Sequence, residues 1–316
     1  MAALALSPAP WWIVAILLTL ALAVRAAVPR HRRRRPRARA VLRALLPSRI
    51  VRSRSGRLDI VAFLFSWLFA GIAFGWALLS SNGWAAAAER GLAGWPSLPF
   101  ALPVPVAATV MTLSLFLSYE AAYWFNHWLS HRVGWLWAFH KVHHTAESLS
   151  LLTNFRVHPV DTILFYNMAA IANGLTAGLV HHLIGPAAME VSVGGTNLLI
   201  FLSSITLSYL QHSHLWIPCR GRLGRWILSP AHHQLHHSTD PRHFNRNLGS
   251  TLAIFDRLAG TLLAPSARRE ALRFGIDGLD HDPHALGGAL IRSFAEAAKA
   301  LAPRALAARA PAKEPA

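Results

Sequence analysis

The sequence predicts an all-α membrane protein, a polytopic helical bundle of about four to five spans with every histidine-rich segment on one side of the bilayer. Three observations lead to this prediction. Of the 316 residues, 53% are hydrophobic and only 14% are charged. Several apolar runs approach the roughly 20 residues that a helix needs to cross a membrane. Histidines follow these runs at separations of three and four, which places their side chains on one helix face.

The N-terminal region carries the signal for membrane orientation. Residues 11–28 form the first predicted span, and twelve arginines follow between Arg30 and Arg57. Positively charged loops stay in the cytoplasm, so we expect the N-terminus outside and residues 29–57 inside. The net charge of +17 would otherwise suggest a nucleic-acid partner. Because so much of it lies beside an apolar segment, membrane topology explains it and nucleic acid is not expected.

Four further apolar runs complete the predicted bundle: 60–79, 100–117, 163–184 and 187–210. Residues 80–98 are predicted to be an external loop with interfacial tryptophans. The last two runs would form a helical pair, but Asn173, Glu190 and Asn197 interrupt it, so a re-entrant hairpin remains an alternative. Either arrangement places 126–158 and 211–316 on the cytoplasmic side.

Two kinds of histidine motif follow the apolar runs. His127 and His131 form an HxxxH motif, and His140, His143 and His144 form an HxxHH motif. The same HxxHH spacing returns ninety-three residues later: His233, His236 and His237. On a helix each set would lie close to one face. This repetition is the strongest chemical signal in the chain.

So many imidazoles at the end of membrane helices predict a metal site. Cys219 is the single cysteine, so neither a disulfide framework nor a thiolate cluster is available. Imidazole suits iron, zinc, copper and nickel alike, so the ligand type does not name the metal. Eight histidines exceed the four ligands of one tetrahedral zinc and therefore predict two metals. The alternative is a pH-sensitive interface or a histidine-lined proton path, which would leave several buried polar groups without partners.

Other histidines are not expected to bind metal. His181 and His182 lie at the outer tip of the predicted hairpin, far from the motifs. His284 lies in a charged stretch and is predicted to be a solvated surface residue. Further along, Leu286, Leu290, Phe294 and Leu301 repeat at nearly helical spacing, which predicts an interfacial helix.

The three histidine motifs resemble those of the membrane-bound fatty acid hydroxylase/sterol desaturase superfamily, whose pattern is HxxxH, HxxHH and HxxHH. The surrounding segments are similar too: LWAFHKVHHTAE, TNFRVHPVD, LQHSHL, SPAHHQLHHS and NRNLGSTLAIFDRLAGTL. The resemblance covers about residues 100–276, and its motifs are highly specific.

This resemblance implies a helical membrane domain with a cytosolic, histidine-rich helical cap. It also implies two non-haem irons and an oxygen- and electron-dependent hydroxylation or desaturation of a lipid. The metal ligands that it implies are His127, His131, His140, His143, His144, His212, His233, His236 and His237. Residues that it leaves as additional ligands or as supports of the ligands are His158, Asp161, His214, His232 and Asp256.

The chain then divides into three regions: a membrane anchor with its basic loop at 1–57, a hydroxylase-like domain at 58–276, and an interfacial helix with a disordered tail at 277–316. No cytochrome domain is visible, so electrons would come from a separate ferredoxin or cytochrome. The expected location is a bacterial inner membrane with a cytoplasmic active site. Fatty acyl chains, sterols or hopanoids, carotenoids and ornithine lipids all remain open as substrates.

Two functions of other classes compete with this prediction. A membrane metal transporter would also collect histidines, but transport sites lie near the bilayer midplane on broken helices. A di-haem electron carrier would use histidine pairs facing each other across helices, and the tight HxxHH groups would crowd a porphyrin. The Soret band of dithionite-reduced protein separates haem from non-haem iron.

Overall fold

The computed structural model describes residues 46–302 apart from 75–78, 186 and 194, and the described chain is mostly helical. The first predicted span, 11–28, lies outside the described residues, as do most of the arginine run and the tail from 303. The α-helices described are α3 (Ser48–Val51), α4 (Arg54–Phe74), α5 (Ser81–Leu92), α6 (Val104–Arg132), α7 (Gly134–His144), α8 (Pro159–Ile184), α9 (Leu198–Thr206), α10 (Gly221–Gly224), α11 (Pro230–His236), α12 (Ile254–Ala259) and α13 (Leu286–Leu301). Short 3₁₀ helices and one antiparallel hairpin join them: η2 (Leu151–Phe155), η3 (Ser208–Leu210), η4 (Pro241–His243), β1 (Ser192–Val193) and β2 (Thr196–Asn197).

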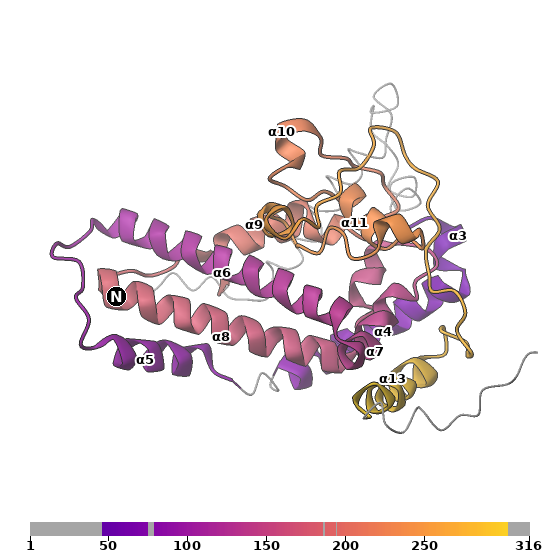
Figure 1. The fold of residues 1–316 in the computed structure, drawn as a ribbon, viewed down its shortest axis with the longest axis horizontal. Coiled ribbons are helices and arrows are strands. Elements are labelled where there is room, and N and C mark those ends of the chain that lie inside the picture. The colour runs from indigo at the N-terminus through magenta and orange to yellow at the C-terminus, as the bar shows by residue number, and fades with distance from the viewer. Residues whose placement is uncertain (1–45, 75–78, 186, 194, 303–316) are drawn as a thin grey trace, which may run out of the picture.

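Helices α6 and α8 lie side by side and antiparallel, and the rest of the chain is arranged along them (Figure 1). Both are long and apolar enough to cross a bilayer. The helix predicted at 163–184 is confirmed and begins at Pro159, whose fixed φ suits a first helical turn. The run predicted at 100–117 continues without interruption to Arg132. The HxxxH motif is therefore the end of a candidate membrane helix, while the total of four to five spans stays a prediction.

The expected loop at 80–98 contains helix α5, so that prediction is wrong. The side chain of Ser80 caps the start of the helix, and a run of alanines follows. Helix α5 packs on α8 at Gly174 and Gly178, which lie one turn apart and have no side chains to separate the two helices. A Cβ atom on Gly178 would lie 2.3 Å from the carbonyl oxygen of Ala85. This close backbone contact is typical of small-residue packing between membrane helices.

The apolar run 187–210 is not one long helix, and the prediction of a membrane-spanning helix there is wrong. The chain forms the β1–β2 hairpin and then the short helix α9. Asn197 explains the break, because its side chain accepts the first N–H groups of α9. The same amide donates to the carbonyl of Thr112 in α6 over 3.0 Å. A polar side chain that would lack partners in lipid is thereby satisfied.

Helix α4 covers the run predicted at 60–79 as far as Phe74, the last residue described before the gap at 75–78. It begins at Arg54, earlier than predicted, and contacts η2 and α8. Its N-terminal half therefore lies near the segment that follows α7.

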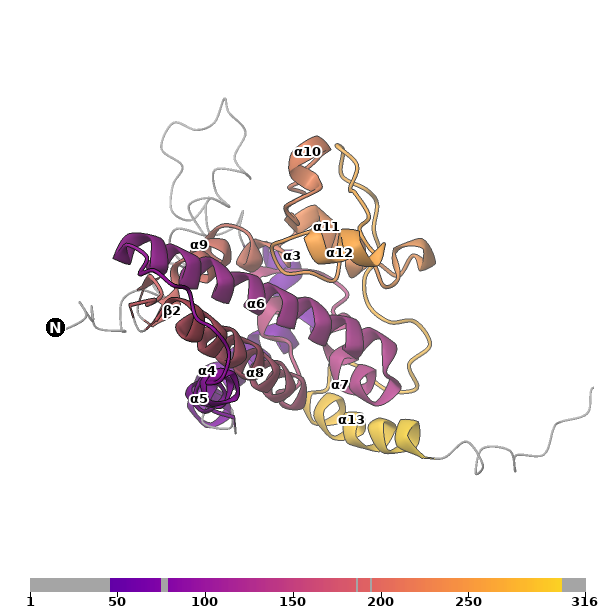
Figure 2. The same ribbon diagram turned by 60° about the vertical axis from the view of Figure 1, so that its left-hand side comes forward.

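The region after η3 forms a cap on the C-terminal half of α6. Figure 2 shows α10, α11 and α12 grouped on one side of α6, with α13 beside α7 at the same end of the molecule. Glu120, a buried carboxylate on α6, joins the two parts. It accepts the backbone N–H groups of Thr251 and Leu252 over 2.9 and 2.7 Å. The cap is thus fixed to the membrane helix by hydrogen bonds to its backbone.

The predicted C-terminal helix is observed as α13, but a different face is buried. Small residues, Ala289, Ser293 and Ala297, face the protein, and Ala297 packs against Phe139 of α7. Phe294, predicted on the apolar stripe, is 55% exposed. Small side chains are buried because they allow α13 to approach α7 closely.

Candidate metal centre

Nine histidines from α6, α7, α11 and the turn after η3 converge at one end of the α6–α8 pair. They form two neighbouring groups, and within each group one nitrogen of every ring lies within 4.8 Å of the others. Group A consists of His127, His131, His140, His144 and His236. Group B consists of His143, His212, His233 and His237. These are the nine ligands that the resemblance implied, although the structure contains no ion and metal binding stays a prediction.

Each HxxHH triplet is divided between the two groups. In α7, His140 and His144 lie one turn apart and belong to group A, whereas His143 points to group B. In α11 the division is reversed, since only His236 belongs to group A. The rings of His144 and His237 stack at a centroid distance of 4.4 Å where the groups meet. The repeated spacing therefore builds two adjoining sites from both triplets.

In group B, two histidines are oriented by the segment that follows α7. The Nδ1–H of His143 donates to the backbone carbonyl of Arg156 over 3.2 Å. The Nδ1–H of His212 donates to the side-chain oxygen of Asn154 over 2.8 Å. The Asn154 amide nitrogen donates to two backbone carbonyls, which fixes which end of the amide faces His212.

In group A, three histidines are oriented by acceptors from three different elements. The Nδ1–H of His127 donates to the carbonyl of Leu248 over 2.7 Å. That of His236 donates to the carbonyl of Arg246 over 2.8 Å. That of His140 donates to the Asp161 carboxylate, at the start of α8, over 2.8 Å. A carboxylate on the second nitrogen makes the ring a stronger ligand.

These hydrogen bonds decide which ring nitrogen carries the proton. A carbonyl oxygen can only accept, so Nδ1 holds the hydrogen and Nε2 of a neutral ring presents a lone pair. In group B the Nε2 atom of His212 lies 2.8 Å from that of His143 and 2.8 Å from that of His233. In group A the Nε2 atoms of His127 and His236 are buried without any hydrogen-bond partner. Lone pairs gathered in this way repel one another unless a cation lies among them.

Burial keeps the rings outside the membrane helices neutral. Desolvation lowers the pKa of His212 and His236 to about 3. The same cause holds the pKa of His143, His233 and His237 well below the ordinary value. The site therefore cannot be a cluster of charged imidazoles at neutral pH. Neutral rings with convergent lone pairs fit a metal ion, because they are its ligand form.

The five further residues singled out in the sequence have different positions. Asp161 orients His140, as described above. Asp256 contacts no histidine; its carboxylate accepts the N–H groups of Leu248 and Gly249 over 2.9 and 2.8 Å. It therefore positions the Leu248 carbonyl that receives the hydrogen of His127. His214 is half-buried and belongs to neither group.

His158 and His232 have structural roles outside both groups. His158 caps α8, where its Nδ1 accepts the N–H of Val160 and its Nε2 donates to the carbonyl of Leu290. His232 accepts the N–H of Ser229 on Nδ1 over 3.1 Å, which is the opposite tautomer from the oriented ligands. Burial lowers its pKa to about 4. The structure thus places His233, and not His232, among the convergent rings.

Sequence reasoning did not identify most of the groups that orient the ligands. Asn154, and the carbonyls of Arg156, Arg246 and Leu248, were not predicted to contact the histidines. Every residue has a backbone carbonyl, so the residue types in the sequence could not show that the carbonyls of Arg156, Arg246 and Leu248 accept these hydrogen bonds. The fourth, Asn154, is a polar side chain in the segment TNFRVHPVD, so its residue type could have indicated a role near the histidines.

Comparisons with known proteins identify sequences that are similar to this chain. Residues 112–261 match the family model of the fatty acid hydroxylases. The chain is similar to alkylglycerol monooxygenase of Danio rerio, 29% identical over 154 residues that cover 48% of this chain and 30% of that protein. It is also similar to the ornithine lipid hydroxylase OlsE of Rhizobium tropici, 26% identical over 185 residues that cover 58% of this chain and 49% of that protein. The chain spans less than half the length of either relative. No solved structure gives a significant match.

Proposed function

We propose that the protein is a membrane-bound oxygenase with two non-haem irons, because residues 112–261 match the family model of the fatty acid hydroxylases. It inserts an oxygen atom into a C–H bond of a lipid, or removes two hydrogens from the lipid to form a double bond. The relatives carry the names of lipid hydroxylases, which supports the lipid as substrate class. In the hydroxylation, one O2, two electrons and two protons convert R–H into R–OH and water.

The observation that carries the proposal is the convergence of nine imidazole rings in two adjoining groups, five of which have an acceptor on Nδ1 that leaves Nε2 unprotonated. Group A would hold one iron and group B the other. Two irons that share O2 supply an oxidant able to attack an unactivated C–H bond. The protein holds five of the ligand rings in one tautomer through Asp161, Asn154 and three backbone carbonyls.

The position of the groups suits a lipid substrate. Both candidate membrane helices lead to the histidines: α6 ends in group A, and α8 begins at the residues around Asp161. An acyl chain or polycycle in the bilayer would therefore reach the metals without crossing water. Among the nine histidines only His131 is not fully buried, and its ring lies 5.1 Å from that of Trp137. We place the substrate approach on this side of group A.

The electrons would come from a separate ferredoxin or cytochrome. The cap exposes a group of arginines around α10: Arg220, Arg222 and Arg225. A positive surface of this kind attracts an acidic partner and speeds its encounter with the protein. The proposed location is a bacterial inner membrane, with the cap in the cytoplasm.

The function is tested by lipid mass spectrometry on cells that express the protein and on cells that lack it. Hydroxylation predicts lipids that gain one oxygen atom, and desaturation predicts lipids that lose two hydrogens. Purified protein with iron, O2, a reductant and a membrane lipid extract should form the same product. An intense Soret band in dithionite-reduced protein, or unchanged lipids in both assays, would contradict the proposal.

A further inference from the structure

Group B depends on a short segment that has no histidine ligand of its own. Residues 150–156, which include η2, supply the acceptors for His143 and His212, two of the four rings of this group. Both contacts lie within three residues, at Asn154 and Arg156. A shift of this segment would turn both rings together. The geometry of group B therefore depends on the contacts that hold this segment in place.

Helix α4 holds it through a buried ion pair. Asp59 on α4 and Arg156 are both almost fully buried, and the Arg156 Nη1 lies 3.3 Å from the Asp59 carboxylate. The same Nη1 donates to the hydroxyl of Ser55 over 2.9 Å. The other Asp59 oxygen accepts the hydroxyl of Thr153 over 2.6 Å. One carboxylate thus binds two residues of the segment, on either side of Asn154.

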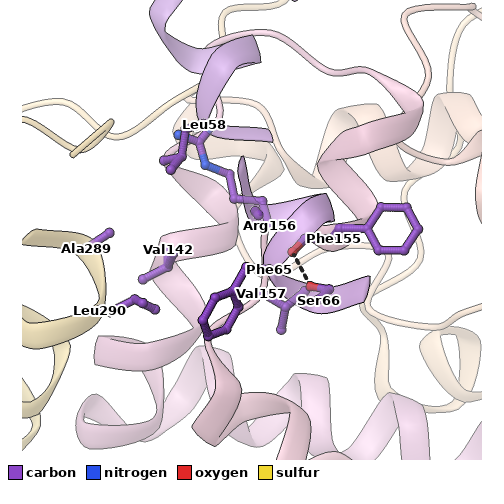
Figure 3. A pocket seen from close by; sticks show the side chains of 10 residues that line it. Leu58, Phe65, Ser66, Val142, Phe155, Arg156, Val157, Ala289 and Leu290 are labelled. Carbon is purple, nitrogen blue, oxygen red and sulfur yellow. Dashed lines mark hydrogen bonds between the residues drawn. The ribbon is translucent and has the colours of Figure 1, made fainter. Parts of the chain in front are cut away.

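Apolar contacts also join α4 to the segment, since the ring of Phe63 packs edge-on against that of Phe155 at a centroid distance of 4.8 Å. Figure 3 shows a small pocket beside this contact, with Leu58 and Phe65 from α4 and Val142 from α7 in its wall. Within the pocket wall, Ser66 donates to the carbonyl of Phe155 over 3.4 Å. To this packing Asp59 adds directional polar contacts with Arg156 and Thr153.

A second flanking region reaches the same guanidinium. The Nη2 of Arg156 donates to Nδ1 of His284 over 2.8 Å. The side chain of His284 is 6% exposed, so the prediction of a solvated surface residue is wrong. His284 directly precedes α13, which packs on α7. Residues from before and after the matched hydroxylase region thus meet at Arg156.

We propose that Asp59 is a positioning residue for the group B metal. It fixes the Arg156 guanidinium and Thr153, so the Arg156 carbonyl and the Asn154 amide stay aligned with His143 and His212. Asp59 lies outside residues 112–261, so a segment beyond the hydroxylase region sets the geometry of one metal site. The inference rests on the proposed metal centre and adds that α4 acts on one of its two halves.

The selectivity follows from the contacts of group A. Its oriented rings depend on Asp161, Leu248 and Arg246, none of which receives a hydrogen bond from the described side chains of α4, residues 54–66. Asp161 therefore serves as the comparison for Asp59, because it orients a ring of group A and Asp59 acts on group B. The Asp59→Asn variant keeps the side-chain shape but leaves Arg156 without its counter-ion, and Asp161→Asn removes the carboxylate from His140.

The experiment is a titration of metal-free, full-length protein in detergent with Co(II), followed by absorption and by metal content after dialysis. Loss of an outer-shell partner typically weakens metal binding about 10- to 100-fold. We expect Asp59→Asn to weaken one of two binding events by this factor and to leave the other unchanged. Asp277→Asn, at an exposed ion pair with Arg273, is the control and should bind like the wild type.

Double variants identify which site is affected. Asp59→Asn should add no further loss to His143→Ala, which already disables group B, and should remove the remaining tight metal from His236→Ala. Equal affinities of wild type and Asp59→Asn for both metals would overturn the inference, and so would equal weakening of both. If Asp59→Asn does not fold, Thr153→Val is measured instead and must weaken the same single event. A wild type that binds fewer than two metals would contradict the proposed function itself.

Discussion

Groups A and B are built from the same repeated motif, yet their surroundings differ. Group A has five rings, a carboxylate on His140 and one ring, His131, that is not fully buried. Group B has four rings, all buried, and is oriented by a neutral amide and a carbonyl. Both triplets contribute to both groups, so the difference arises from the residues around the histidines.

The difference would give the two proposed metals different roles. A carboxylate partner strengthens a ligand ring and stabilises positive charge on the metal. Partial exposure of His131 gives group A the side on which a substrate can approach. Group B, closed and held by η2 and α4, would keep its geometry while the other site exchanges small molecules.

The largest effects are expected when a ligand is removed from either group. His236→Ala should lose the group A metal, and His143→Ala should lose the group B metal, each with loss of lipid product. Neighbours three residues away cannot occupy the vacant coordination position, because each belongs to the other group. Metal content and O2-dependent lipid oxidation are measured on each variant. Full activity in both variants would remove the metal-site hypothesis.

A smaller effect is expected when the orienting groups are changed. Asp161→Asn should weaken metal binding in group A about 10- to 100-fold, and Asn154→Leu should do the same in group B. The two variants are compared by the affinity of each binding event. If both variants weaken the same event, the assignment of Asp161 and Asn154 to different sites is wrong.

Acidification should destabilise the metal-free protein through both groups. Burial holds the pKa of His212 and His236 near 3 in the folded chain, against 6.5 for exposed histidine. Above pH 6.5 both folded and unfolded states are neutral, so these rings add no pH dependence. Between 6.5 and 3 only the unfolded state takes up protons, so the unfolding free energy falls by up to about 1.4 kcal/mol per pH unit and ring.

This pH dependence is measured by chemical unfolding of the metal-free protein in detergent at several pH values below 7. The His212→Asn variant lacks one of the titrating rings and should show a shallower slope. A free energy of unfolding that does not change down to pH 5 would show that the rings are not kept neutral by burial.

The smallest effects are expected at histidines outside the groups. His181 lies near the far end of α8 and contacts Glu89, and His182 is its neighbour. His181→Ala and His182→Ala should leave metal content and product formation intact. His232→Ala removes the contact to Ser229 and should lower stability mildly without loss of metal. Loss of a metal in His232→Ala would mean that His232 replaces His233 as a ligand.

Eight of the nine converging histidines could be named from the sequence because helical spacing and motif repetition are local properties, whereas His212 was named only through the family resemblance. The contents of each group could not be named from the sequence, because His140 and His143 diverge only when α11 and the turn before His212 pack against α7. Spacing shows that residues share a helix face, but it does not show which partner that face meets. The division of each triplet is therefore a tertiary feature.

The errors in the fold have similar causes. The alanine-rich residues of α5 look like a loop beside Trp84 and Trp95, and their helix depends on the room left by Gly174 and Gly178. The run 187–210 has the hydropathy of a span, but Asn197 finds partners on α6 and ends it. His284 has charged neighbours in the sequence, but it is buried in contact with Arg156 and Glu147. In each case a distant residue decides the local structure.

The most direct test of the account is the number of metal ions per folded chain. Protein prepared anaerobically with iron under reducing conditions is freed of excess metal, and iron and protein are quantified in the same monodisperse sample. Two adjoining groups of neutral imidazoles predict about two irons per chain. Zinc carried through purification would occupy the same positions, so both metals are counted. A total of one metal or none in well-folded protein would contradict the dinuclear centre.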